Sequence, residues 1–304
     1  MKFTTLLPCI LAGCTLSLQA GTPAEAVSAK DTKQVYVPPI PASWKDKTIS
    51  PVADLIFFED PIVHSEITPV FMYHDIDSDF PLTGGGHSEI YGARVQFAVT
   101  PRLGIFLSKG GYMDIHPGNG GKEFGGWADT GFGVKYMAID DEADQFVLTP
   151  GIGYTPPWGD KTILFGHGNG EWNFFTSAEK GFGDFHLTAR VGLRLPNDTQ
   201  ANSTFFHYGV QADYYFCRYF IPFVSGVGYT VVNAGNSIPI DAEGADSQNF
   251  GSSLSQGNTQ FLIGAGFRSK ITDTIDIGVA YQKGVVKPYG TFDDRVTVAV
   301  QFKF

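Results

Sequence analysis

The stretch Asp294-Arg-Val-Thr-Val-Ala-Val-Gln-Phe-Lys-Phe304 decides the fold class of this chain. Its odd and even positions differ strictly in polarity, with Val296, Val298, Val300, Phe302 and Phe304 on one parity and Arg295, Thr297, Ala299, Gln301 and Lys303 on the other. Successive side chains of a strand point to opposite faces, so this pattern predicts a strand with one apolar and one polar face. Chain ends usually fray, whereas this alternation continues to Phe304. A strand that closes a barrel, with lipid on one side and a polar lumen on the other, would need such a pattern.

The same alternation recurs from residue 66 onward, in segments separated by turn-forming residues. The clear segments are 91–99, 103–108, 128–136, 146–154, 186–194, 206–214, 261–268 and 275–282, and weaker ones lie near 66–75, 171–180 and 219–232. Together with the last stretch they make about twelve strands. Single-chain bacterial barrels have an even number of strands, and this total agrees with that rule.

The connections between these segments alternate in length. Short turns are expected at 100–102, 139–144, 181–184, 217–218 and 272–273, and longer loops near 76–87, 114–125, 156–170, 196–203, 233–256 and 284–293. Short periplasmic turns and long external loops are typical of an up-and-down transmembrane barrel, whereas a soluble sandwich has no such requirement. An even strand number also places both chain termini in the periplasm.

The composition supports the same class of protein. Aromatic residues make up 14% of the chain and charged residues only 17%, and 37 of the 304 residues are glycine. No apolar run after the leader reaches the roughly 20 residues that a spanning helix needs. A membrane protein without such a run must be a closed barrel, because hydrocarbon offers no partner to open backbone groups. The net charge of −10 excludes the basic surface that a nucleic-acid partner would require.

We therefore predict an all-β, up-and-down antiparallel β-barrel of about twelve strands over residues 66–304, located in the outer membrane of a Gram-negative envelope. Its expected partners are outer-membrane lipid, lipopolysaccharide, the barrel-assembly machinery and small-molecule solutes.

The residues before the barrel form two further regions. Residues 1–20 carry Lys2 and then an apolar core, which is typical of a secretory signal peptide. In an alternative interpretation Leu11-Ala12-Gly13-Cys14 is a lipobox and Cys14 is acylated. Residues 21–65 are rich in proline, which disfavours helix and central strand. We expect a periplasmic tether in preference to the other possibility, a plug that enters the lumen through the apolar run Asp54-Leu-Ile-Phe-Phe58.

Charged residues at inward-facing positions are the candidate solute contacts, because charge on the lipid face would cost about 2–4 kcal/mol at the membrane midplane. By parity they are Arg94, Asp129, Lys135, Arg190, Arg194, Asp213, Arg268 and Asp276. They could form a selectivity ring that draws anionic solutes. They could equally fill the lumen with arginine–carboxylate pairs.

We expect no cofactor, no metal site and no enzymatic activity. The run Asp75-Ile-Asp-Ser-Asp79 places oxygen ligands at alternate positions, but Phe80 and Gly86 stand where a calcium loop needs Gly and Glu. His186 and His207 face the lumen, and His167 lies in a loop whose His-Gly-Asn-Gly sequence lacks the Ser of an outer-membrane phospholipase.

Three stretches resemble a group of outer-membrane barrels that includes the transporter family linked to phenol degradation: Asp129-Thr-Gly-Phe-Gly-Val-Lys-Tyr136, Pro150-Gly-Ile-Gly-Tyr154 through Trp158-Gly-Asp160, and the terminal Phe302-Lys-Phe304. The resemblance covers the barrel and not the segment before it. It implies that Phe302 and Phe304 form the signal read by the assembly machinery. It also implies a passive pore or transporter for small compounds, hydrophobic ones among them.

The function expected from the sequence is thus a passive, porin-like channel or transporter for small solutes. The alternative is a non-conducting barrel that serves as a structural anchor or displays its loops for adhesion. Filling of the lumen would favour the second.

Overall fold

The computed structural model describes residues 43–160 and 169–304, so the expected signal peptide and Cys14 lie outside the described residues. The described elements are the 3-10 helix η1 (Trp44–Asp46) and the strands β1 (Glu66–Ile76), β2 (Gly86–Ala98), β3 (Leu103–Pro117), β4 (Phe124–Trp127), β5 (Gly131–Tyr136), β6 (Ile139–Asp141), β7 (Phe146–Thr155), β8 (Glu171–Phe182), β9 (Phe185–Pro196), β10 (Thr204–Tyr214), β11 (Ile221–Asn233), β12 (Thr259–Lys270), β13 (Ile275–Gly284) and β14 (Asp294–Lys303). No helix among these residues is long and apolar enough to cross a membrane.

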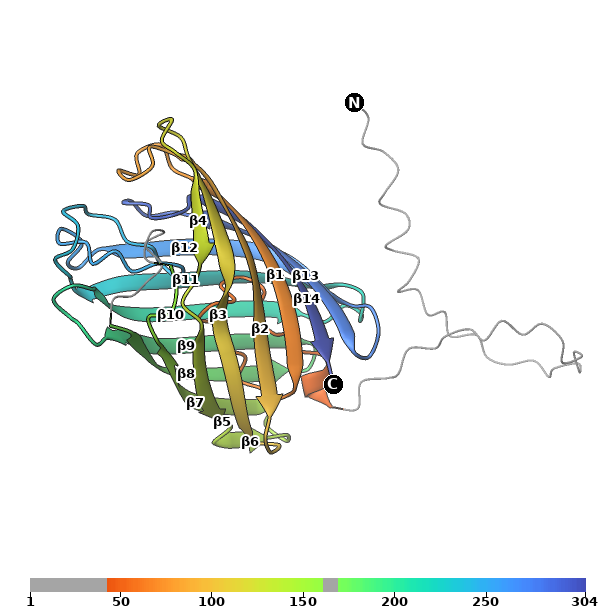
Figure 1. The fold of residues 1–304 in the computed structure, drawn as a ribbon. Helices are drawn as coiled ribbons and strands as arrows, with labels where there is room; N and C mark the ends of the chain where they lie inside the picture. Colours follow the sequence, from red (N-terminus) through yellow and green to blue (C-terminus); the bar gives the residue numbers. More distant parts are fainter. Residues whose placement is uncertain (1–42, 161–168) are drawn as a thin grey trace, which may run out of the picture.

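The strands form one antiparallel sheet that closes on itself (Figure 1). Each strand pairs with its neighbours in sequence, and β14 completes the ring by pairing with β1, as in Val70 opposite Ala299 and Phe71 opposite Val298. Strands β4 and β5 both pair with β3 and count as one interrupted strand. The short β6 pairs with the start of β7, on the side where β5 pairs with the rest of β7, and so adds no further strand to the ring. The fourteen strands thus make a closed barrel of twelve, which confirms the predicted fold class.

The interruption between β4 and β5 corrects one predicted strand. The sequence pattern predicts a continuous strand over 128–136, but residues 128–130 leave the ladder. There the Asp129 carboxylate accepts a hydrogen bond from the Gly159 backbone, and Asp160 N–H donates to Trp127 at 2.8 Å. The chain after β7 therefore takes over the pairing at this point, and polarity alternation alone does not reveal such a local competition.

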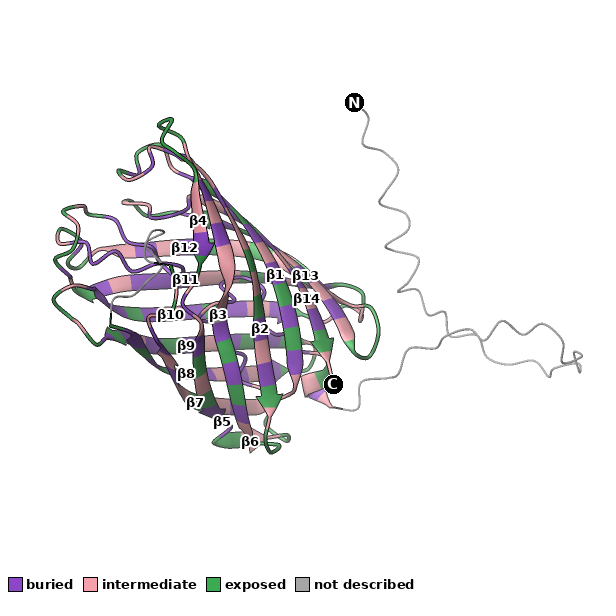
Figure 2. Ribbon diagram, in the orientation of Figure 1, coloured by how far each residue is buried: buried purple, intermediate pink, exposed green. Residues whose placement is uncertain are grey.

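Burial alternates along the strands as the sequence predicts, which Figure 2 shows as bands of buried and exposed residues. In β14, Arg295, Thr297, Ala299 and Gln301 are buried, whereas the residues between them face outward and Phe302 is 42% exposed. The outer surface of the barrel is thus apolar and its inner wall is polar.

The alternation of short and long connections is also confirmed. The short ones link β2 to β3, β6 to β7, β8 to β9, β10 to β11 and β12 to β13. The longer ones link β1 to β2, β3 to β4, β7 to β8, β9 to β10, β11 to β12 and β13 to β14. All short turns lie at one end of the barrel, which we call the short-turn end; β1 begins there and β14 ends there, with Glu66 opposite Lys303. We call the opposite rim the long-loop end.

Pro150 lies at a bulge in the ladder: Lys135 pairs with Gly151 but Ile139 pairs with Leu148, so residues 136–138 oppose only residues 149 and 150. On the side of β8 the register does not shift, and Pro150 lies opposite Thr176. On its other side β5 pairs only as far as Gly151, and β6 pairing begins at Leu148. The missing N–H of proline therefore falls in the gap between two partner strands, where no ladder bond is lost.

Two segments fill the interior of the barrel. From the short-turn end, residues 43–65 enter between the strands and return to β1, and Ile49, Val52, Ala53 and Leu55 pack there against β1, β11, β13 and β14. From the long-loop end, the connection between β11 and β12 folds inward, so that Ala242, Glu243 and the run 245–250 are buried. Residues 43–65 thus lie inside the barrel.

The outward-facing apolar wall leads to a stability prediction. Val298 lies in the middle of β14, between Val279 of β13 and Phe71 of β1, on the lipid-facing parity. We expect Val298→Arg to lower the free energy of unfolding from lipid vesicles by about 2–4 kcal/mol, because it places a charge near the membrane midplane. Urea titration in vesicles measures this, and Val298→Leu, which stays apolar at the same depth, should change it little. Equal effects of both variants would show that this face does not contact lipid.

Candidate functional site

The eight charged residues predicted to face the lumen are all buried inside the barrel, each 5% exposed or less. Five carry positive charge and three negative charge. Their contacts in this structure are with the segments that fill the lumen and with neighbouring strands, and their contact with a solute stays a prediction.

Arg94 and Lys135 hold the second half of the filling segment. Arg94 of β2 pairs with the Glu59 carboxylate at 2.7 Å and donates to the Leu55 carbonyl at 3.2 Å. Lys135 of β5 donates to the backbone carbonyls of Asp60 and Ile62. These cations donate to carbonyl groups that the irregular backbone of the segment does not pair internally. One wall of the barrel thus supplies hydrogen bonds that the segment lacks.

Neutral side chains add to this anchoring. Gln96 of β2 donates to the His64 carbonyl at 2.8 Å, and Thr149 of β7 donates to the Pro61 carbonyl at 2.6 Å. Residues 55–64 are therefore bonded to the wall formed by β2, β5 and β7.

A second wall holds the first half of the segment. Arg268 of β12 donates to the Ser50 carbonyl at 3.1 Å and to the Gln301 side chain at 2.8 Å. Lys270, at the end of the same strand, donates to the carbonyls of Asp46 and Thr48. The segment is thus fixed from two sides of the ring.

Asp54 lies at the innermost turn of the segment and is completely buried. Its carboxyl group contacts the Arg190 guanidinium of β9 and accepts a hydrogen bond from the Tyr229 hydroxyl of β11. Asp246, from the inward-folded connection, forms a side-chain hydrogen bond with Asp54 and an ion pair of 2.7 Å with Arg295. The two filling segments therefore meet in the lumen at these two carboxyl groups.

Arg194 of β9 connects both filling segments to the wall. Its guanidinium makes a two-pronged pair with Glu171 of β8 at 2.8 and 3.2 Å and donates to the Ala245 carbonyl at 2.6 Å. It also stacks over the Phe57 ring, 4.4 Å from the centroid. A planar guanidinium suits this combination of bidentate pairing and stacking.

Of the three predicted acidic residues, two have partners on the wall and one has a partner in the connection after β7. Asp213 bonds His186 Nδ1 at 2.8 Å, and Asp276 bonds Lys303 Nζ at 2.7 Å. Asp129 accepts from the backbone of Gly159 at the strand interruption.

Sequence reasoning missed the acidic partners of the basic wall. These are Asp54 and Glu59 of the filling segment, together with Glu171 and Asp246. Asp54 and Glu59 bracket the apolar run Leu55–Phe58, and a short apolar run flanked by carboxylates within a proline-rich stretch could have indicated a segment suited to a basic lumen.

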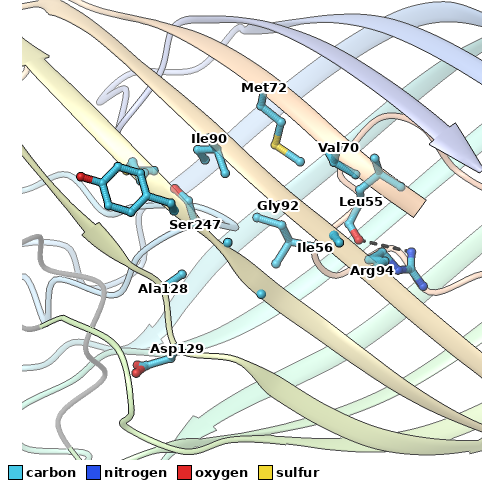
Figure 3. Close-up of a pocket in the computed structure, with 15 residues that line it drawn as sticks. Leu55, Ile56, Val70, Met72, Ile90, Gly92, Arg94, Ala128, Asp129 and Ser247 are labelled. Atoms are coloured by element: carbon cyan, nitrogen blue, oxygen red, sulfur yellow. Dashed lines mark hydrogen bonds between the residues drawn. The ribbon is translucent and has the colours of Figure 1, made fainter. Parts of the chain in front are cut away.

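Next to Arg94 the segment leaves an apolar pocket of about 50 Å3 against β1, β2 and β3 (Figure 3). Leu55, Val70, Met72 and Ile90 line it, and Ser247 reaches it from the inward-folded connection. A second apolar pocket of about 210 Å3 lies toward the long-loop end and shares Met113 with the first. This side of the lumen is thus apolar, unlike the walls that hold the segment.

The described ranges 43–160 and 169–304 contain no group of three or more His, Cys, Asp or Glu side chains placed to hold a metal ion.

Solved structures with the same fold include an outer-membrane channel from Pseudomonas putida F1, which is 10% identical with a TM-score of 0.61 over 84% of this chain and 100% of that one. The NanC porin is 11% identical with a TM-score of 0.50 over 79% of this chain and 100% of its own. No protein-family model and no curated protein sequence matches the chain. At this identity the likeness establishes the fold, that of an outer-membrane β-barrel.

The Arg94–Glu59 pair leads to a prediction about docking of the filling segment. Arg94→Met leaves the Glu59 carboxylate buried without its partner, which should weaken docking by about 3–5 kcal/mol. Hydrogen–deuterium exchange at the amides of residues 55–62 should then be faster by about a hundredfold or more.

Two further variants test whether the unpaired charge of Glu59 causes the faster exchange. Lys283→Met removes an exposed pair with Asp294, 3.1 Å long, at the rim and should leave this exchange unchanged. Adding Glu59→Gln to Arg94→Met should recover most of the lost protection, because no buried charge then remains unpaired. If the single and double variants exchange alike, the charge of Glu59 is not what holds the segment.

Proposed function

We propose that the chain is an outer-membrane channel or transporter that passes small solutes through the barrel of residues 66–304, and that residues 43–65 are its plug. The observation that carries this is the kind of contact between the segment and the wall. Arg94, Gln96, Lys135 and Thr149 donate to backbone carbonyls of the segment, and water can replace such bonds when the segment moves. The fold, shared with outer-membrane channels, supports the proposal.

The topology supports one orientation in the membrane. In bacterial barrels short turns face the periplasm and long loops face outward. The plug enters at the short-turn end, beside the start of β1 and the end of β14, so both termini of the barrel would be periplasmic. The long loops would then lie among lipopolysaccharide, and the inward-folded connection would close the lumen from outside.

The charge balance of the open lumen supports a preference among solutes. Displacing the plug would remove Asp54 and Glu59, the carboxylates that neutralise Arg190 and Arg94 in the closed lumen. The guanidinium groups of Arg190 and Arg94 would then lack partners. Five of the eight predicted lumen residues are basic, so the open lumen would favour anionic or polar solutes. The apolar pocket beside β1 and β2 offers a surface to the hydrophobic compounds that the family resemblance implies.

The filled lumen is also the observation that favours the alternative function, a non-conducting barrel that anchors or displays its loops. Residues 43–65 and the inward-folded connection together bury Asp54 and Asp246 completely in the interior. The two functions differ in whether the plug can leave, and a cross-link that prevents its movement separates them.

The Val52–Gly278 contact allows such a cross-link. A Cβ built on Gly278 of β13 lies 3.5 Å from Val52 Cβ, within the range of disulfides. We expect Val52→Cys with Gly278→Cys to form a disulfide that fixes the plug. Single-channel recording in a planar bilayer should show openings after reduction and few or none after oxidation.

The single variant Val52→Cys is the control, because it should respond to neither treatment. Equal currents in the oxidised and reduced double variant would mean that the plug does not gate the lumen. No current from any variant, with the barrel shown to be folded, would support the non-conducting barrel.

The terminal aromatic residues lead to a prediction about assembly. Phe304 is 69% exposed beyond the end of β14, and Phe302 faces outward on the same strand. We propose that they form the signal read by the assembly machinery. Phe304→Ala should slow insertion by the purified machinery into vesicles, while unassisted folding in detergent is unchanged. Phe267→Ala, which removes another outward-facing aromatic ring, is the matched control, and an equal delay in both variants would contradict a terminal signal.

A further inference from the structure

Strands β8, β9 and β10 place seven polar side chains side by side on the inner wall. Their register sets Ser177 opposite Arg190 and Glu179 opposite Thr188, with Thr188 in turn opposite Gln211 and His186 opposite Asp213. We call this group the β8–β10 patch: Ser177, Glu179, His186, Thr188, Arg190, Gln211 and Asp213. Every member is 2% exposed or less.

Most polar atoms of the patch have no hydrogen-bond partner within the described part of the chain. They are Ser177 Oγ, Glu179 Oε1, His186 Nε2, Thr188 Oγ1, Arg190 Nε and Nη1, both side-chain polar atoms of Gln211, and Asp213 Oδ2. A buried polar group without a partner is costly, and most native buried polar groups are paired. The density of unpaired groups at this one place therefore requires an explanation.

The plug covers the patch and bonds it at few points. Trp44 packs against the His186 ring at 6.4 Å between centroids, Thr48 reaches Glu179, and Asp54 contacts Arg190. The hydrogen bonds that fix the plug backbone come from β2, β5 and β7 on one side and from β12 on the other. Among the members of the β8–β10 patch, Glu179 and Arg190 thus supply the hydrogen bonds to the plug, and most other polar atoms of the patch take no part in holding it.

We propose that the β8–β10 patch lines the open pathway and that the plug conceals it in the structure described here. This inference rests on the proposed channel function and names the wall along which solute moves. Once the plug separates from this wall, water and solute satisfy the unpaired groups, which gives the patch a purpose that the closed lumen does not show.

The chemistry of the patch defines the solutes that it favours. Arg190, Gln211, Thr188 and Ser177 supply donors, while Glu179 and Asp213 supply acceptors. A small hydrophilic solute with both donors and acceptors can bond such a wall, whereas a hydrocarbon cannot. The apolar pocket lies on β1–β3, separated from β8 by the interrupted strand β4/β5 and by β7, so one side of the lumen is apolar and the other is polar.

The experiment compares two buried, inward-facing glutamines of the full-length chain. Gln96, 1% exposed, donates to the plug carbonyl of His64, whereas Gln211, 0% exposed, has no partner among the described residues. The variants are Gln96→Leu, Gln211→Leu and Thr188→Val, each close in size to the residue it replaces. Two quantities are measured: hydrogen–deuterium exchange at the amides of plug residues 44–64, and single-channel current in potassium chloride.

Gln211→Leu and Thr188→Val should leave exchange unchanged or slower, because replacing an unpaired polar group by an apolar one is neutral or stabilising. The same variants should reduce the current about twofold or more, because they remove polar lining from the pathway. Gln96→Leu should do the opposite: exchange faster by about tenfold, since two plug carbonyls lose a donor, and current increased.

Faster exchange in Gln211→Leu, matching that of Gln96→Leu, would overturn the inference, because Gln211 would then be bonded in the closed lumen. A wild-type current that Gln211→Leu and Thr188→Val leave unchanged would overturn only the pathway and leave the channel function standing. Absence of current from the wild type and all variants, even with the reduced cross-link variant, would overturn both.

Discussion

Pairing of β14 with β1 is the constraint on which the rest of this structure depends. Backbone groups in hydrocarbon must find partners within the protein, and an open sheet edge would leave a row of them unsatisfied. The register of β1 against β14, with Phe71 opposite Val298, removes the last edge and turns the sheet into a ring of twelve strands. Once the ring is closed, its outer side must be apolar and its inner side must receive the polar residues.

A ring of twelve strands creates an interior that the wall alone does not fill. Eight strands enclose little more than their own side chains, and sixteen leave an open aqueous channel. In this chain the intermediate space is occupied by residues 43–65 from one end and by the inward-folded connection from the other. In the proposed function, filling by separate segments instead of by larger wall side chains is what lets movement of a segment open the interior.

The charges of the wall and of the plug form one balanced system. Arginines on the wall would be costly if buried without partners, and the plug supplies carboxylates to Arg94 and Arg190 together with carbonyls to Lys135 and Arg268. The plug in turn could not bury its irregular backbone without outside donors, because that backbone makes few bonds of its own. Wall and plug therefore supply each other's hydrogen-bond and ion-pair partners. The unbonded polar atoms on β8–β10 are an exception to this complementarity.

The sequence by itself determined the barrel, its strand number and the inward direction of the charged residues. These follow from a period of two, which a strand imposes locally, and from connection lengths, which are read along the chain. Only the tertiary structure decided that residues 43–65 lie inside, that Asp54 meets Asp246, and that the strand predicted over 128–136 breaks at Asp129. These features depend on contacts between residues far apart in sequence, such as Arg94 with Glu59 or Gly159 with Asp129. Polarity alternation shows which way a side chain points, but it carries no information about which distant group it will meet.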